Sequence, residues 1–131
     1  MAAITWDPKT MSTGVPIVDA QHQEWIRRYN EFDKAISQGK GLEAVQSTLD
    51  FFIAYADVHF KLEEAIMDER HCPAAAANRA AHEHMQNILS GFEKYAKKHG
   101  YSINEIVNLR LRMGEWLITH ILTVDTQLRD S

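Results

Sequence analysis

The chain has 131 residues, which is enough for one well-buried core and too few for two ordinary domains. Its 14 basic and 18 acidic side chains give a net charge of −4 without a basic stripe, which argues against nucleic acid or anionic lipid as a partner. No apolar stretch approaches the roughly 20 residues that span a bilayer, and residues 1–8 lack the pattern of a secretory signal. Because the single cysteine, Cys72, cannot form a disulfide within the chain, we expect a protein of the reducing cytoplasm.

The first 17 residues contain prolines and a glycine without periodicity, and this pattern predicts an extended arm. We expect Trp6 and Ile17 of this arm to pack on the rest of the fold. Asp19 is a candidate N-cap for a first helix that ends near Gln38, because Gly39 follows. Side chains at steps of three and four form the seam of this helix, and they are Val18, His22, Trp25, Tyr29, Phe32 and Ile36.

A second helix is predicted to begin after Gly41 and to run to about Arg70, where the segment 71–73 interrupts it with a proline. His59 and Glu63 are four residues apart on this helix and lie one above the other on its apolar face. A buried carboxylate and a buried imidazole are costly unless something pairs with them. The seam on which they lie consists of Leu42, Val45, Leu49, Phe52, Ala56, His59, Glu63 and Ile66.

Pro73 occupies a favoured first helical position and opens a third helix that runs to Lys98, with Gly100 as its stop. Ser102 and Glu105 form a capping box for a fourth helix, which tails off beyond residue 125. The two seams consist of Ala75, Asn78, His82, Met85, Leu89, Phe92 and Ala96, and of Ile106, Leu109, Met113, Trp116 and His120.

Helical periodicity in every long segment, short connections and the absence of strand signals predict an all-α fold. We expect one domain over residues 1–131, with an extended N-terminal arm at about 1–17 and four helices at about 18–128. The helices should form an antiparallel up-down four-helix bundle.

Four of the seven histidines lie on the predicted seams, one on each helix, and they are His22, His59, His82 and His120. One such histidine is usually a satisfied core residue, but four of them, joined by Glu63, would require four separate coincidences. Imidazoles and carboxylates that converge in a bundle core suit iron, and also manganese or zinc. Two acids and several histidines would oversupply one ion, whereas carboxylates can bridge two.

Asp125 lies five residues after His120, so on a straight helix it points about 140° away from that histidine. Both can reach one site only if the helix widens by a residue or ends there. The other histidines receive structural interpretations. His84 points away from the seam two positions after His82, and His99 suits the C-terminus of a helix.

Several motifs are spread along almost the whole chain, and they are Trp6, Gly14, Asp19-x-Gln21-His22, His59-Phe60-x-x-Glu63-Glu64-x-x-Met67, His82 and Trp116-Leu117-x-x-His120-Ile121-x-x-x-Asp125. Taken together, these motifs resemble the bacterial hemerythrin domain. The resemblance implies two iron ions with an oxo or hydroxo bridge, and dioxygen or small anions as ligands. It implies that His22 and His59 hold one iron, that His82 and His120 hold the other, and that both irons share Glu63 and Asp125. Candidates for the apolar wall of the pocket are Trp25, Phe60 and Trp116.

One position departs from the family pattern. The family usually has two histidines four apart on the third helix, and counting from Pro73 places the second on His82 and the first on Asn78. A neutral amide is a weaker ligand than imidazole, so Asn78 provides either a weak ligand or an open position, unless a residue such as His71 completes the set. A second exchangeable position should speed loss of the oxygenated state to the diferric form.

Four functions are compatible with the resemblance. The first is a sensor domain fused to or partnered with a signalling output. The chain ends six residues after Asp125 without such an output, so we expect an excised module. The second is a stand-alone dioxygen carrier or store. The third is a diiron peroxidase or oxidase, for which the only further acid–base candidate is Glu64, interpreted as a surface carboxylate or an outer partner of the centre. The fourth is an iron-sensing or structural bundle.

Overall fold

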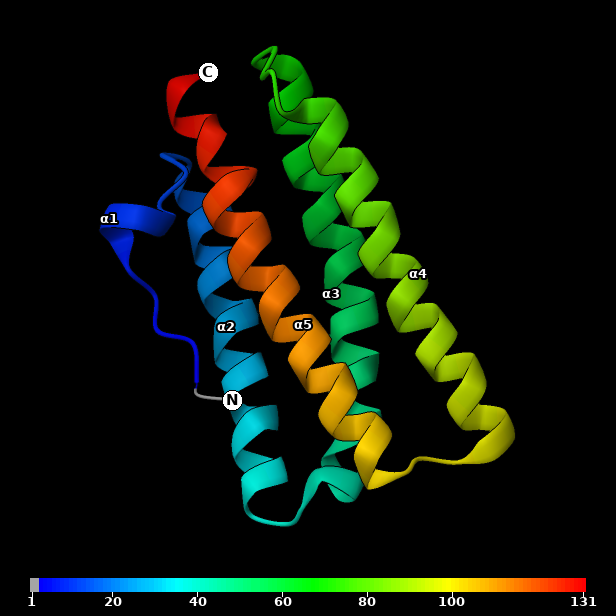
Figure 1. Cartoon of the computed structure of the whole chain (residues 1–131). Coiled ribbons are helices and arrows are strands. Elements are labelled where there is room, and N and C mark those ends of the chain that lie inside the picture. Colours follow the sequence, from blue (N-terminus) through cyan, green and yellow to red (C-terminus); the bar gives the residue numbers. More distant parts are fainter. Residues whose placement is uncertain (1–2) are drawn as a thin grey trace.

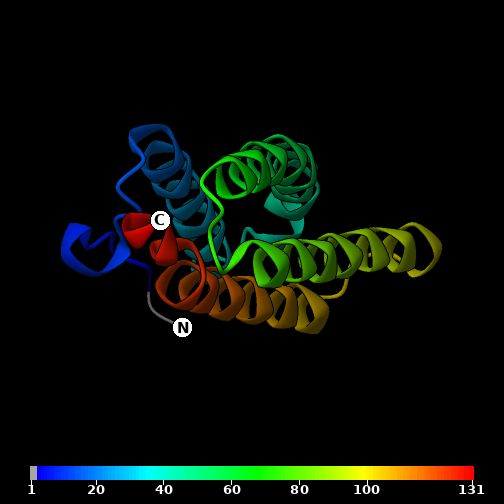
Figure 2. The same cartoon turned by 90° about the horizontal axis from the view of Figure 1, so that it is seen from above.

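The computed structural model of the chain describes residues 3–131, and these residues form helices without strands. The segments are α1 (Pro8–Met11), α2 (Pro16–Ser37), α3 (Gly41–Glu69), α4 (Ala75–His99), α5 (Ile103–Thr123) and the 3₁₀ helix η1 (Asp125–Asp130). The four long helices α2 to α5 run alternately in opposite directions (Figure 1). Viewed from above, α2 and α3 lie on one side of the interior and α4 and α5 on the other (Figure 2). The predicted antiparallel four-helix bundle is confirmed.

Most helix ends lie where the sequence predicts them. Gly39 and Gly100 lie just beyond the C-terminal ends of α2 and α4, and both adopt left-handed backbone, with φ of 76° and 80°. At the start of α5, Ser102 Oγ accepts the backbone N–H of Glu105 at 3.3 Å and donates to its carboxylate at 2.8 Å. This pairing satisfies a free N–H at the helix start and confirms Ser102 as the N-cap, while the Glu105 carboxylate bonds to the Ser102 hydroxyl and not to its backbone N–H as in a full capping box.

The expected extended arm contains one turn of helix, α1, because the Asp7 carboxylate accepts a backbone N–H of that turn. Trp6 packs partly buried against the main core, which confirms its predicted role. The same prediction is wrong for Ile17, which is 54% exposed. The helix begins at Pro16, and in this register Val18 faces the interior while Ile17 faces outward.

Asp19 does not cap α2, because Val15 occupies the N-cap position and has no side-chain cap. Asp19 lies instead inside the first turn and fastens the arm to the helix. Its carboxylate accepts the backbone N–H and the hydroxyl of Thr13, both at 2.8 Å, and the hydroxyl of Ser12 at 2.9 Å. An anionic side chain in the first turn is also favoured by the helix dipole.

Two further expectations at helix starts are wrong. Leu42 is 56% exposed, because the buried backbone of Gly41 takes the first inward position of α3. A side chain at Gly41 would come within 3.1 Å of Ile36, so the two helices approach each other closely there. The helix α4 begins at Ala75 rather than at Pro73, because residues 70–74 form a turn in which His71 has a φ of 53°.

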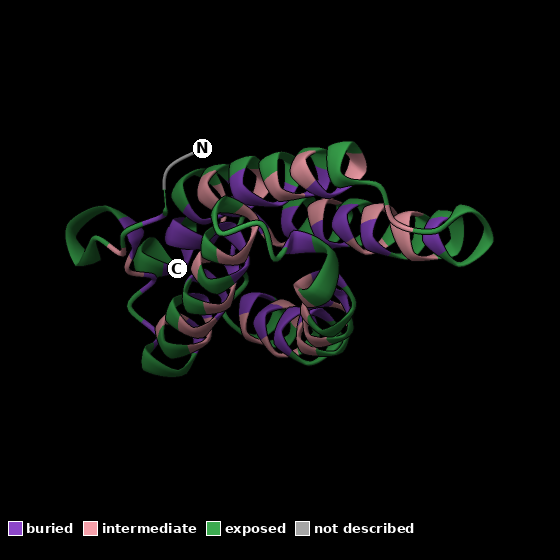
Figure 3. Cartoon of the chain, turned by 90° about the horizontal axis from the view of Figure 1, so that it is seen from below, coloured by how far each residue is buried: buried purple, intermediate pink, exposed green. Residues whose placement is uncertain are grey.

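Buried residues lie on the inward faces of the helices (Figure 3), and the buried apolar residues among those described form three clusters. The largest includes Trp25, Phe60, Met85 and Leu117, a second surrounds Leu128 of η1, and a third consists of Phe32, Val45 and Ile106. On each long helix the predicted metal-binding residues lie between side chains of the first two clusters in the sequence. The bundle therefore places a polar layer between two apolar ones.

Candidate metal centre

The structure brings all six predicted metal-binding side chains together in the polar layer. Each has an exposed fraction of 5% or less, and they are His22, His59, Glu63, His82, His120 and Asp125. They come from all four long helices and from η1. Burying so many ionisable groups away from water is unfavourable unless they pair with one another or bind a cation.

The α2–α3 half of this layer contains two imidazoles and one oxygen from each acid. His22 Nε2 lies 3.1 Å from Glu63 Oε2 and 3.1 Å from Asp125 Oδ2. His59 Nε2 lies 3.3 Å from the same Glu63 oxygen. These three residues of α2 and α3, His22, His59 and Glu63, form one cluster of atoms that could hold a metal ion.

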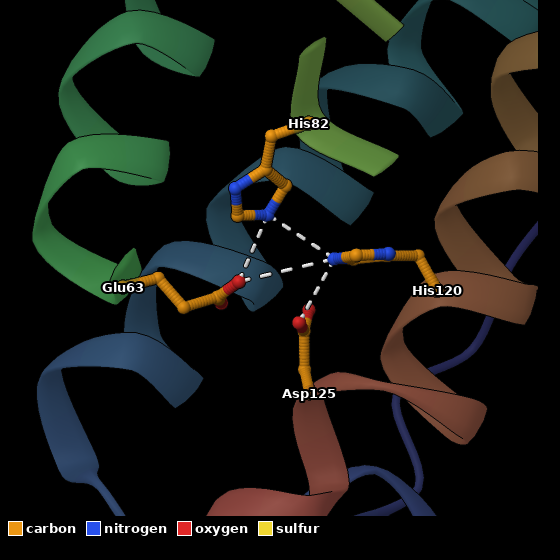
Figure 4. Close-up of side chains that lie close together, drawn as sticks. All are labelled: Glu63, His82, His120 and Asp125. Carbon is orange, nitrogen blue, oxygen red and sulfur yellow. Dashed lines mark hydrogen bonds and ion pairs between the residues drawn. The ribbon is translucent and has the colours of Figure 1, made fainter. Parts of the chain in front are cut away.

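The α4–α5 half uses the other oxygen of each acid (Figure 4). His82 Nε2 lies 3.0 Å from Glu63 Oε1, and His120 Nε2 lies 2.9 Å from Asp125 Oδ1. The two imidazole nitrogens are 3.1 Å apart. With metal–ligand bonds of about 2.1 Å, neighbouring ligand atoms of one octahedral ion are about 3 Å apart. The spacing therefore matches a ligand shell, and each carboxylate has the orientation needed to bridge two ions.

The hydrogen bonding of the layer is incomplete in a way that suits cations. Glu63 Oε1 and Asp125 Oδ1 lie close to imidazole nitrogens, yet neither oxygen accepts a hydrogen bond of acceptable geometry. A hydrogen bond that is far from linear is weak even where its donor and acceptor lie close together. Buried acceptors without donors are rare in folded proteins. The imidazole nitrogens and carboxylate oxygens therefore face shared positions that a cation could occupy, and they are not aligned as N–H···O hydrogen bonds.

Asn78, at the position where the resemblance implies a histidine, also lies in this layer. Its side chain is fully buried, and its Oδ1 lies 2.8 Å from His120 Nε2. The Asn78 Nδ2 atom has no hydrogen-bond partner. His71, the alternative considered from the sequence, is exposed in the turn before α4 and belongs to neither cluster. Of Asn78 and His71, only Asn78 therefore lies where it could provide a ligand atom to the α4–α5 half.

Asp125 reaches the layer because the long helix ends before it. The helix α5 stops at Thr123, and Val124 has φ −112° and ψ −60° at the junction with η1. This junction turns the chain so that Asp125 and His120 face the same centre, which a continuous α-helix would not allow. Of the two routes that the sequence left open, a widened helix or a helix end, the structure uses the second.

Two side chains outside the layer orient the histidines. His59 Nδ1 donates to Gln21 Oε1 at 2.6 Å, and His82 Nδ1 donates to a carboxylate oxygen of Glu64 at 3.0 Å. Because both acceptors lie on the Nδ1 side, the Nε2 atoms are left to face the centre. The sequence identified Glu64 only as a surface carboxylate or outer partner. The sequence gives Gln21 no role beyond its place in a motif, and its position directly before His22 is the one signal that it lies near the centre.

The charges of the layer shift the pKa values of its members in the metal-free chain. Burial opposes protonation of His22 and His120, but the adjacent carboxylates of Asp125 and Glu63 favour the charged imidazole more strongly and raise the pKa of each to about 9. Burial alone would raise the pKa of Glu63, yet the surrounding imidazoles hold it well below 4.5. Burial lowers the pKa of His59, and its hydrogen bond to Glu63 opposes this only in part. In the metal-free chain, protons supply part of the positive charge that the acids require.

Aromatic side chains enclose the layer on the side of the main core. Phe60 stacks on the His82 ring at 3.8 Å, and Trp116 stacks on the His120 ring at 4.5 Å. Trp25 packs edge-on against His59 at 5.6 Å. Trp25 and Phe60 are buried, whereas Trp116 is half-buried and lines a surface groove of about 420 Å³ together with His120. The three predicted wall residues therefore all contact the histidine rings.

A helical bundle whose core holds two clusters of imidazoles joined by shared carboxylates defines a cation-binding four-helix bundle. Residues 13–129 match the family model described as the Hemerythrin HHE cation binding domain, and the chain belongs to the hemerythrin family.

Individual relatives agree with this assignment. The chain is 28% identical to the bacteriohemerythrin of Methylococcus capsulatus over 125 residues, which cover 95% of this chain and 93% of that protein. It is 27% identical to the bacteriohemerythrin of Stenotrophomonas maltophilia over 130 residues, covering 99% and 82%. A crystal structure of wild-type hemerythrin superposes with a TM-score of 0.82 at 26% identity, covering 95% of this chain and 94% of that one.

Family membership confirms the resemblance and the cofactor predicted from the sequence. Hemerythrins bind a diiron centre, and the two clusters in this chain could hold its metal ions. The family also binds dioxygen at this centre, so the function in its general form is diiron oxygen binding. Among the described residues, no helix is long and apolar enough to cross a membrane.

Proposed function

We propose that this chain is a redox-responsive diiron domain, a sensor module whose metal pair oxidises readily in air. His22 and His59 would hold one ion, and His82 and His120 would hold the other. Both ions would share Glu63 and Asp125, which lie between the two pairs of imidazoles. When bound, the diferrous pair supplies the electrons that dioxygen takes up.

Asn78 is the observation that carries the proposal. It is fully buried with its Oδ1 2.8 Å from His120 Nε2, so an amide stands where an imidazole is expected. A neutral amide oxygen is a weaker donor to iron than imidazole, and water or a small anion can compete with it. The α4–α5 half would then have an exchangeable position of its own. Easier access of water and anions favours oxidation over reversible binding.

The proposal is tested by the substitution Asn78→His. The added imidazole should close the exchangeable position, so the diferrous protein should oxidise to the diferric form more slowly in air-saturated buffer, followed by its visible spectrum. Asn87→His is the matched control, because Asn87 is exposed on the same helix and adds a histidine away from the centre. An unchanged or faster oxidation in Asn78→His would contradict the proposal.

The position of Asp125 supports the sensor role. This shared acid belongs to η1, and Leu128 of the same segment is fully buried against Val18 and Met67. The Leu128 carbonyl also accepts from Arg70 at 3.5 Å. A change of charge at the metal pair would therefore act directly on a short segment that is packed against the end of α3, where a change in packing can be read by a partner.

Hydrogen exchange measures this coupling. A sensor should show different backbone protection in residues 125–130 between the diferrous and diferric forms, while residues 45–52 at the far end of α3 serve as the internal control. If residues 125–130, like the control residues 45–52, have the same protection in the diferrous and diferric forms, the sensor role is contradicted.

A stand-alone dioxygen carrier is the second candidate, and the depth of the centre favours it. All six proposed ligands are 5% exposed or less, and Phe60 and Trp25 exclude water from one side of the layer. Slow oxidation of the unsubstituted protein, with full recovery of the diferrous form on removal of dioxygen, would support the carrier over the sensor.

A further inference from the structure

The two histidines with outward hydrogen bonds have unequal partners. On α3, His59 Nδ1 lies 2.6 Å from the amide oxygen of Gln21. On α4, His82 Nδ1 lies 3.0 Å from a carboxylate oxygen of Glu64. An amide oxygen and a carboxylate oxygen both accept, so each imidazole holds its proton on Nδ1 and presents a lone pair on Nε2. The difference between the two partners is charge.

Glu64 is itself held in place by a second residue of α4. Arg79 Nε lies 3.3 Å from the other carboxylate oxygen of Glu64, and Arg79 Nη2 donates to Asp68 at 2.6 Å. Arg79 directly follows Asn78 in α4, so adjacent residues of one helix contact Glu64 on the outside of the layer and His120 within it. The side chain of His82 is 1% exposed and that of Glu64 is 23% exposed, so this chain of contacts leads from the buried layer to the surface.

From this arrangement we infer that Glu64 is a positioning residue that strengthens His82 as a ligand and makes the two metal positions inequivalent. The inference rests on the proposed function, because it requires that His82 hold an ion. A carboxylate that accepts the N–H of a metal-bound imidazole fixes the ring and makes its other nitrogen more basic. Gln21 fixes the His59 ring in the same way but contributes no net charge.

The charged partner lies on the half of the centre that contains Asn78. That half lacks an imidazole relative to the family pattern, and Glu64 offsets part of the loss by making His82 a stronger donor. Arg79 keeps the carboxylate oriented without removing its hydrogen bond to His82, because it contacts the opposite oxygen. Glu64 and Asn78 thus act on the same ion in opposite directions.

The test uses stepwise zinc binding to the metal-free protein, measured by competition with a chromophoric chelator. Glu64→Gln keeps the shape and an acceptor oxygen but removes the charge. It should weaken one of the two binding steps by about 10- to 100-fold, the usual effect of losing an outer partner, and leave the other step unchanged. Gln21→Glu is the reciprocal change and should strengthen the other step.

Two further variants identify the affected position. His82→Ala removes the proposed ligand, so Glu64→Gln should have no further effect on the ion that remains. Glu83→Gln is the matched control, because Glu83 is next to His82 in the sequence but exposed on α4. It should leave both steps unchanged.

The outcomes separate this inference from the proposed function. If the unsubstituted chain binds fewer than two ions, the proposed pair of metals is wrong. If it binds two ions and Glu64→Gln changes neither step, or weakens both equally together with the melting temperature of the metal-free chain, Glu64 has no specific role at His82 and the inference is overturned.

Discussion

The two halves of the centre use the same kinds of side chains in different surroundings. Each half offers two imidazoles and one oxygen from each of Glu63 and Asp125. The α4–α5 half adds the amide of Asn78 and the charged outer partner Glu64, whereas the α2–α3 half has the neutral outer partner Gln21. The shared acids make the two positions interdependent, and the unshared residues set the difference between them.

The largest effect is expected from Glu63→Gln, because Glu63 belongs to both halves. Loss of this shared charge should weaken both zinc-binding steps by more than about 100-fold, the upper end for an outer partner alone. Chelator competition measures both steps. Glu69→Gln, an exposed carboxylate of the same helix, is the control. Retention of two tightly bound ions in Glu63→Gln would show that the halves do not share this residue.

A smaller effect, confined to one half, is expected when one histidine is removed. His59→Ala and His82→Ala should each leave about one tightly bound zinc ion per chain, because the other half keeps both of its imidazoles. Metal analysis after gel filtration counts the ions. Loss of both ions in either variant would mean that neither half can bind alone, and retention of two would exclude that histidine as a ligand.

Helical periodicity explains why the sequence could predict that the four histidines meet in the core, whereas their division into two halves came from the family resemblance. His22, His59, His82 and His120 continue seams of large apolar residues, and a side chain on such a seam faces the interior wherever the neighbouring helices lie. Burial of the bundle core therefore brings the four rings together. The burial of Asn78 followed from the same seam.

Features near helix ends and between helices could not be predicted in this way. Leu42 fits the helical spacing of its seam, and Ile17 is an apolar residue of the predicted arm. The path of the chain at the first turn of each helix decides which side faces inward, and both side chains are exposed. The direction of Asp125 depends on where α5 stops, which its spacing from His120 left open. The role of Gln21 depends on how α2 is rotated against α3, and one sequence carries no information on that angle.

The smallest effect is a pH dependence that involves both halves of the metal-free chain. The pKa values of His22 and His120, about 9, lie above the ordinary value of 6.5, so protonation of these groups stabilises the folded chain at and below pH 6.5. This contribution is lost as the pH rises through 9. The lowered pKa of His59 acts in the opposite direction, since its protonation below pH 6.5 is unfavourable in the folded chain.

The melting temperature of the metal-free protein should therefore fall between pH 6.5 and 9, whereas zinc affinity should rise over the same range, because binding must displace these protons. His22→Asn and His120→Asn should each remove part of the slope, one from each half. A melting temperature that is flat or rises across this range would contradict the assigned protonation.

Reconstitution with ferrous iron under anaerobic conditions, followed by gel filtration and metal analysis, tests the paired centre most directly. Two iron ions per chain are expected, with a change in the visible spectrum when air is admitted. Binding of one ion or none, with no spectral response to air, would contradict a centre built from two halves around shared acids.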